Sequence, residues 1–174
     1  MTAFTSIPSS TNLFLPTGFI FTVKKLPHIN FNVQRVGIPT LTLPAVNHPN
    51  PFTEITYGGD HISWGPFSVT FLLDEELKGW EELKDWMIAM GYPRDSEEYA
   101  LVAANPIWSQ EGLYSEASLL ITTNNKNVQK EFTFRDAHPI DLSGFEATVE
   151  TTGSGITCTA TFGYTLFESK TVIS

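Results

Sequence analysis

The chain has 174 residues, 41% of them hydrophobic and 13% aromatic, and this length fits one domain because single domains cluster at about 100 to 150 residues. Nineteen acidic against ten basic residues give a net charge of −9, which argues against nucleic-acid binding through a basic patch. An acidic balance can also serve solubility alone. Charged residues make up 17% of the chain, below the roughly 25% usual for soluble domains, so we expect much of the surface to face other protein.

Residues 1–17 are rich in Ser, Thr and Pro and are predicted to form a flexible N-terminal arm that docks on a neighbour, ahead of a single domain over residues 18–174. The start of the chain lacks the regions of a cleavable signal peptide, and no apolar run approaches the ~20 residues of a membrane span. The single cysteine, Cys158, lies in a predicted strand on the same face as alternate apolar residues, and it is predicted to lie in the core. We therefore expect a soluble protein made in a reducing compartment, without a membrane partner.

Two segments with apolar alternation, Phe19–Val23 and Ile29–Val33, predict an antiparallel hairpin. The next stretch, Gly37–Phe52, holds four prolines, which remove backbone donors and prevent a central strand. It is predicted to be an edge strand or an extended excursion. Long segments of this kind usually serve binding, although a mobile surface loop is the alternative.

A strand-to-helix unit follows. Residues 57–60 predict a loop, and the alternating run Phe67–Leu73 predicts a strand. Asp74 is a suitable N-cap for a helix over residues 75–90, whose apolar side chains recur at spacings of three and four. Gly91 is predicted to end this helix in a left-handed conformation.

The remaining sequence reads as loop and strand. Residues 92–112 predict a loop with a short helical turn, and the turn-forming segments 124–127 and 153–155 predict hairpin connections. The predicted strands are residues 117–123, 128–135, 145–150 and 156–167. The fold class is therefore mainly β (α+β), an antiparallel β-sandwich or barrel of about seven strands with one flanking α-helix.

No motif for catalysis, a metal or a cofactor emerges, so we expect a protein that is not an enzyme and has no cofactor. The lone cysteine cannot build a Cys/His zinc site, and Gly58-Gly59-Asp60 lacks the lysine of a nucleotide-binding loop. Carboxylates could still pair in space, but helix capping and solvation explain them more simply. The histidines form no H-x-x-x-H or H-E-x-x-H pair and are interpreted as ordinary loop residues: His28, His48, His61 and His138.

In chain order, the segments that carry a family resemblance are Phe19 to Val23, the Gly37-Ile38-Pro39 to Pro44 excursion, Ile55 to Asp60, Phe67 to Phe71 with Asp74-Glu75, Leu83 to Trp86, Val128 to Glu131, and Pro139 followed by Gly144-Phe145-Glu146. In order and spacing this series resembles the tail tube proteins of contractile-tailed bacteriophages, from about Gly18 to Glu168. The Pro-rich excursion and residues 92–112 depart from that pattern.

The resemblance implies a protomer that assembles into hexameric rings, which stack into the inner tube of a contractile tail and serve as a conduit for DNA ejection. It implies a place in the virion tail after assembly in the host cytoplasm. The implied partners are the tail sheath protein, baseplate and tail-terminator proteins, and a tape measure protein in the lumen. Double-stranded DNA would pass through without specific binding.

Two sets of site residues follow as expectations. Contact with an adjacent ring or subunit is predicted for the Pro-rich excursion, at Pro44, Val46, Asn47, His48, Pro49, Pro51 and Phe52. An acidic lumen lining, over which DNA would slide without adhering, is predicted at Glu131, Glu146 and Glu150.

Two alternatives stay open. One is a baseplate tube initiator or a tube cap of the same fold, which copy number per particle would distinguish from a shaft protein. The other belongs to a different class, a soluble β-sandwich module that binds carbohydrate or a small ligand, and it predicts a stable monomer with a concave aromatic site.

Overall fold

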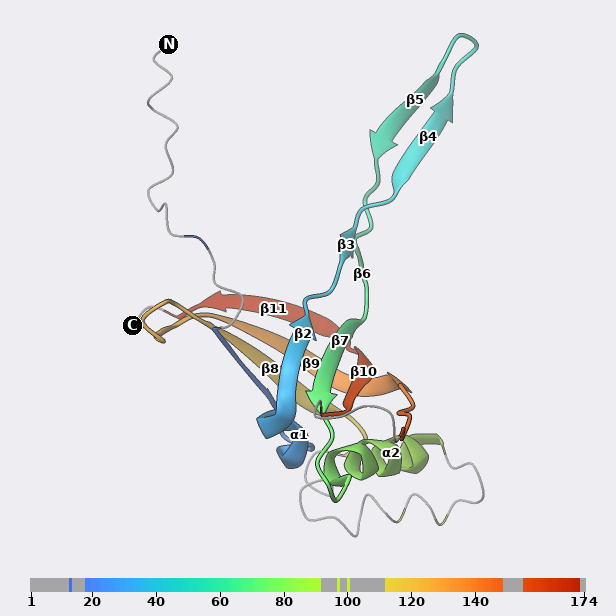
Figure 1. Ribbon diagram of the computed structural model, residues 1–174. Coiled ribbons are helices and arrows are strands. Elements are labelled where there is room, and N and C mark those ends of the chain that lie inside the picture. Colours follow the sequence, from blue (N-terminus) through green and yellow to red (C-terminus); the bar gives the residue numbers. More distant parts are fainter. Residues whose placement is uncertain are drawn as a thin grey trace.

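A computed structural model describes residues 13, 18–91, 97, 100, 112–148 and 155–172. Within these residues, seven strands form one antiparallel sheet in the order β1-β8-β9-β10-β7-β2, with β11 also paired to β9 (Figure 1). The elements are β1 (Phe19–Val23), α1 (Pro27–Asn32), β2 (Val33–Gly37), β3 (Leu41–Thr42), β4 (Ala45–Pro49), β5 (Glu54–Gly58), β6 (Ser63–Trp64), β7 (Phe67–Leu72), α2 (Lys78–Gly91), β8 (Ser115–Thr122), β9 (Val128–Leu142), β10 (Thr157–Gly163) and β11 (Leu166–Thr171).

The sheet folds over on itself because β9 belongs to both of its layers. The N-terminal part of β9 pairs with β8 and β11, and its C-terminal part pairs with β10. Between the two parts, Asp136 adopts a φ of 54°, a left-handed conformation that interrupts the ladder. The first layer consists of β1, β8, β11 and the start of β9, and the second of β2, β7, β10 and the end of β9.

An aromatic core holds the two layers together. The ring of Phe67 in β7 stacks on Phe134 of β9 at a centroid distance of 4.2 Å and on Phe162 of β10 at 5.2 Å. It also meets the edge of Phe21 in β1 at 6.2 Å. Ring pairs of this geometry stabilise beyond their buried area. The predicted fold class, a mainly β sandwich or barrel with a flanking helix, is confirmed.

The alternation in β7 and β10 gives each strand a buried and a wetter face. Phe67, Val69 and Phe71 are buried and lie opposite Phe162, Ala160 and Cys158 in register. Cys158 is a fully buried core residue, as predicted, and its thiol donates to the Ser143 carbonyl oxygen at 2.9 Å. On the other face, the hydroxyls of Thr70 and Thr159 hydrogen-bond at 3.2 Å.

Helix α2 begins four residues after the predicted Asp74 cap. The Leu77 N–H donates to the Asp74 carbonyl, and Leu77 has a φ of 54°, so Glu75 and Glu76 lie in a turn ahead of the helix. The Asp74 carboxylate accepts from the Lys78 N–H at 3.3 Å and so keeps its capping role. Gly91 is the last helical residue and does not have the left-handed φ predicted for it.

The predicted hairpin between residues 19–23 and 29–33 is wrong. Residues 27–32 form helix α1 instead, with Pro27 in its first turn, where a fixed φ and a missing N–H are tolerated. Asn30 closes the connection, since its side chain accepts from the Val23 N–H at 2.8 Å and donates to the Val23 carbonyl at 3.1 Å. Strand β1 therefore pairs with β8, and β2 pairs with β7.

Three other expectations need correction. Strand β9 continues to Leu142, seven residues past the predicted end at Arg135. The single strand predicted over residues 156–167 is divided into β10 and β11 by a bend at residues 164–165. Residues 145–148 are not in a strand, and residues 149–150 lie outside the described part.

The turn at residues 124–127 is confirmed, with Lys126 at a φ of 62°. The N-terminal arm except Leu13, most of residues 92–112, and residues 153–154 of the other predicted turn lie outside the described residues, so those expectations stay predictions.

The Pro-rich excursion is an extended hairpin, confirming the second of the two predicted forms. Strands β3 and β6 pair at its base, and β4 and β5 pair farther out. Residues 57–58, predicted as loop, belong to β5. We call residues 38–66 the hairpin arm, which projects away from the two layers from the ends of β2 and β7 (Figure 1). Neither α1 nor α2, nor any other helix of the described residues, is long and apolar enough to cross a membrane.

Candidate functional site

The outer half of the hairpin arm has two chemically different faces. Val46 lies opposite Tyr57, and His48 lies opposite Ile55, so these four side chains share one face, because directly opposed residues in an antiparallel pair point the same way. We call this set the apolar face of the arm. The other face carries Asn47 opposite Thr56 and Pro49 opposite Glu54.

The described part of the chain leaves the apolar face largely exposed. Val46 is 57% exposed, Tyr57 is 58% exposed, and Phe52 between the two strands is 96% exposed. A two-stranded ribbon alone is at best marginally stable in water, and apolar strand pairs in solvent invite association. The exposed arm is therefore a candidate contact surface.

The base of the arm is held on an aromatic cluster. The Trp64 ring lies 5.1 Å from that of Phe167 in β11, and Phe167 stacks on Phe132 at 5.6 Å. The Tyr164 hydroxyl donates to the Gly65 carbonyl at 2.9 Å, and burial raises the pKa of Tyr164 above its ordinary value. These contacts fix the direction in which the arm leaves the body.

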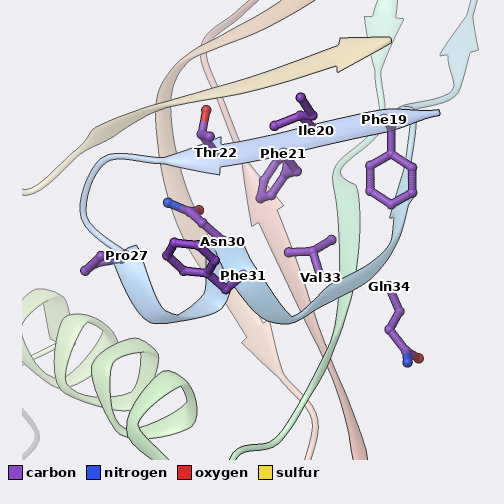
Figure 2. Close-up of a pocket in the computed structure, with 9 residues that line it drawn as sticks. All are labelled: Phe19, Ile20, Phe21, Thr22, Pro27, Asn30, Phe31, Val33 and Gln34. Carbon is purple, nitrogen blue, oxygen red and sulfur yellow. The ribbon is translucent and has the colours of Figure 1, made fainter. Parts of the chain in front are cut away.

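An open groove of about 740 Å³ runs beside β1, opposite α1 and the start of β2. Figure 2 shows Phe19 and Phe21 on the side of β1 that faces β2, with Ile20 and Thr22 on its other side. Phe31 of α1 is 92% exposed at this groove. The groove is lined by Phe19, Ile20, Phe21, Thr22, Pro27, Asn30, Phe31, Val33 and Gln34.

Two smaller hollows adjoin this groove and share Phe19 with it. One, of about 320 Å³, is lined in part by Arg35 and Ile38, and the other, of about 310 Å³, reaches Lys126. The linings of the groove and of these two hollows hold two basic residues and no acidic residue. This is an uncommon balance in a chain with a net charge of −9.

The outward face of the first layer carries paired charges. Arg135 contacts Glu168 at 3.0 Å, and Lys24 contacts Glu116 at 3.0 Å. Glu131 lies on the same face, opposite Lys170 of β11 in register. We call Glu116, Glu131, Glu168 and their basic neighbours the charged sheet face.

The structure brings together the predicted contact residues but not the predicted lumen residues. All seven contact residues, Pro44, Val46, Asn47, His48, Pro49, Pro51 and Phe52, lie on the hairpin arm. Of the acidic residues, Glu131 lies on β9, Glu146 is exposed in a segment that is not the strand predicted there, and Glu150 lies outside the described residues.

Sequence reasoning missed the return strand of the arm. Ile55 and Tyr57 complete the apolar face, whereas the sequence pattern predicts a loop over residues 57–60, which includes Tyr57, and no strand there. Three successive β-forming residues, Ile55, Thr56 and Tyr57, after a Pro-rich stretch are the available signal for a hairpin.

Two of the histidines contact a carboxylate. His28 contacts Glu82 at 2.5 Å between α1 and α2, and His61 contacts the adjacent Asp60 at 2.6 Å. No group of three or more His, Cys, Asp or Glu side chains among the described residues is arranged to hold a metal ion.

Comparison with known proteins gives a sequence relative and several shared folds. None of the protein-family models matches the chain. The tail tube terminator protein of Enterobacteria phage T4 is 28% identical over 157 residues, covering 84% of each chain. The tube-terminating cap of the anti-feeding prophage has a TM-score of 0.64 at 11% identity, over 98% of this chain and 100% of that chain.

A second solved structure, the sheath–tube complex of the extracellular contractile injection system PVC, has a TM-score of 0.62 at 11% identity, over 93% of this chain and 94% of that chain. At these identities the solved structures show a common fold. Together with the T4 relative, they do not favour a soluble ligand-binding module. The relative and the shared fold together support a structural, tube-related protein of a contractile tail or injection system.

Proposed function

We propose that this protein forms a ring that terminates the inner tube of a contractile phage tail. The observation that carries the proposal is the 28% identity to the T4 tail tube terminator over 84% of both chains. The likeness of the fold to a tube-terminating cap supports it further.

The ring itself is proposed to be a hexamer of this chain. Strands β1, β2 and β11 each pair with one described strand, so each presents a backbone edge that a neighbouring protomer can cover. The hairpin arm would reach an adjacent protomer or the adjoining ring. The charged sheet face, with Glu131, would line the bore, to which Glu146 and Glu150 would also contribute.

The partners follow from this position. The tail would be assembled in the host cytoplasm. The ring would contact the tube and the sheath, and the baseplate and tape measure proteins during assembly. Double-stranded DNA would pass through the bore without specific binding, because a face of balanced charge offers no run of cations to its phosphates.

A second candidate is the tube shaft itself. Its support is the fold likeness to the PVC sheath–tube complex, whose TM-score of 0.62 is close to the 0.64 of the cap. The two candidates differ in copy number, since a shaft needs many stacked rings and a terminator needs one.

Electron microscopy of the purified full chain over a wide concentration range tests both. A terminator is expected to give single rings that do not stack, and antibody labelling of tails should mark one end. Long tubes from the chain alone would favour the shaft. A dispersed monomer at every concentration and salt would overturn both candidates.

A further inference from the structure

We propose that the hairpin arm of one copy docks in the groove beside β1 of a second copy, with the apolar face of the arm turned inward. The inference rests on the proposed self-assembly and names the surface that receives the arm.

The described part of the chain leaves the outer arm uncovered. Val46, Tyr57 and Phe52 are all more than half exposed. The groove lies beside α1, at the start of β2. The arm leaves from the end of β2 and points away from the groove (Figure 1). An arm held by Trp64 and Tyr164 at its base is directed away from its own groove and toward another molecule.

The groove has the chemistry to receive a strand. Among the described strands β1 pairs with β8 alone, so its other edge, apart from Val23, whose backbone groups bond to Asn30, can accept a strand beside an apolar lining. Addition of a strand at such an edge gives main-chain hydrogen bonds, and alternate side chains enter the pocket. Ile55 and Tyr57 alternate in this way on β5. Burying them together with Phe31 removes apolar surface of both copies from water.

Charge favours the arm over other segments as the occupant. Between Arg35 and Lys78 the sequence has no Lys or Arg, so the arm carries the carboxylates Glu54 and Asp60, the latter beside His61, and no Lys or Arg. The groove and its adjoining hollows are lined by Arg35 and Lys126 without an acidic residue. Glu54 points to the polar face, so its carboxylate would lie at the rim, where charges guide association and orientation.

Cross-linking between two single-cysteine variants of the full chain tests the contact. Val46→Cys is mixed with Gln34→Cys, and a short bifunctional maleimide is added after assembly. Cys158 is buried and stays in place. Thr56→Cys serves as the matched control, because it lies on the same ribbon but on the opposite face. We expect linked heterodimers in several-fold higher yield with Val46→Cys than with Thr56→Cys.

A charge exchange gives a second readout. Arg35→Glu with Lys126→Glu is expected to reduce ring yield, and adding Glu54→Arg with Asp60→Arg to the same chain is expected to restore part of it. If Arg35 and Lys126 only stabilised the fold of the protomer, the two added arginines would not restore the ring yield.

The outcomes separate the inference from the proposed function. Rings that form without the Val46–Gln34 link, or with equal linking from Thr56, would overturn the docking site and leave the proposed function standing. If the link forms only after residues 1–12 are removed, the chain's own N-terminal segment would be the occupant of the groove. Absence of any assembly would overturn both.

Discussion

Phe67 is the residue on which the two layers of the fold most depend. Its ring contacts Phe21, Phe134 and Phe162, and the side chain is 1% exposed. Phe67→Ala is expected to lower the free energy of unfolding by about 3–5 kcal/mol, because it leaves a cavity and removes the ring contacts. Denaturant unfolding of the purified chain measures the change.

Phe31→Ala is the matched control for that prediction. This ring is 92% exposed, so its removal is expected to change the free energy of unfolding by less than about 0.5 kcal/mol. A loss at Phe31 as large as that at Phe67 would contradict the placement of α1.

Tyr164 couples the body to the arm and carries a pH dependence. Burial raises the pKa of this phenol, so the folded state holds its proton at alkaline pH values where the unfolded state has released it. The stabilisation is therefore complete below the ordinary tyrosine pKa and is lost as the pH rises toward the folded value. Tyr164→Phe is expected to make the unfolding midpoint less sensitive to pH above about 10.

The same variant also removes the hydrogen bond to the Gly65 carbonyl. At neutral pH it is expected to cost about 0.5–1.5 kcal/mol, the usual net contribution of one such bond. Unfolding curves of Tyr164→Phe and wild type at neutral and alkaline pH give both effects. An identical alkaline response in the two proteins would show that Tyr164 is not the titrating group.

At the scale of elements, the hairpin arm is separable from the body. Pro44 and Gly59 are hydrogen-bonded across its two sides at 2.9 Å, so residues 45–58 can be replaced by a two-residue Asn-Gly turn without stretching the chain. The shortened protein is expected to keep the unfolding transition of the wild type and to lose ring formation, as judged by sedimentation and electron microscopy.

Removing the Pro-rich half alone would be a poorer experiment, because it leaves β5 without its partner β4. Unchanged ring formation after excision of both strands would count against the arm as an assembly element. Loss of folding would show that the arm contributes to the protomer beyond its base at Trp64.

At the scale of the whole molecule, the acidic balance predicts an assembly that does not retain DNA. Assembled wild-type protein is expected to show no retention of double-stranded DNA in a filter assay at about 0.15 M salt, where charges farther apart than about 8 Å are screened. Replacing Glu116, Glu131 and Glu168 with Lys would make the charged sheet face basic and is expected to produce salt-dependent retention.

A matched variant separates net charge from position. Glu75→Lys, Glu76→Lys and Glu81→Lys change the charge equally at exposed sites near the start of α2. Equal retention by the two variants would argue that the charged sheet face does not line the bore.

Local patterns in the sequence were sufficient for several elements. The alternation in residues 67–72 and 157–163 identifies β7 and β10, and it places Cys158 on the buried side. The spacing of apolar residues identifies α2 with its buried Leu83 and Trp86. These features depend on neighbours a few positions apart, which a single sequence displays directly.

Which strands pair was decided only by the tertiary structure. Residues 29–33 alternate like a strand, yet Pro27 and the two Asn30 hydrogen bonds favour a helical turn. Strand β1 then pairs with the distant β8, where Phe19 lies opposite Ile121, and β2 pairs with β7, where Val36 lies opposite Val69. The length of β9 likewise depends on two different partner strands, β11 and β10. Pairing energies arise between segments distant in sequence, so the alternation that predicts a strand does not predict its neighbour.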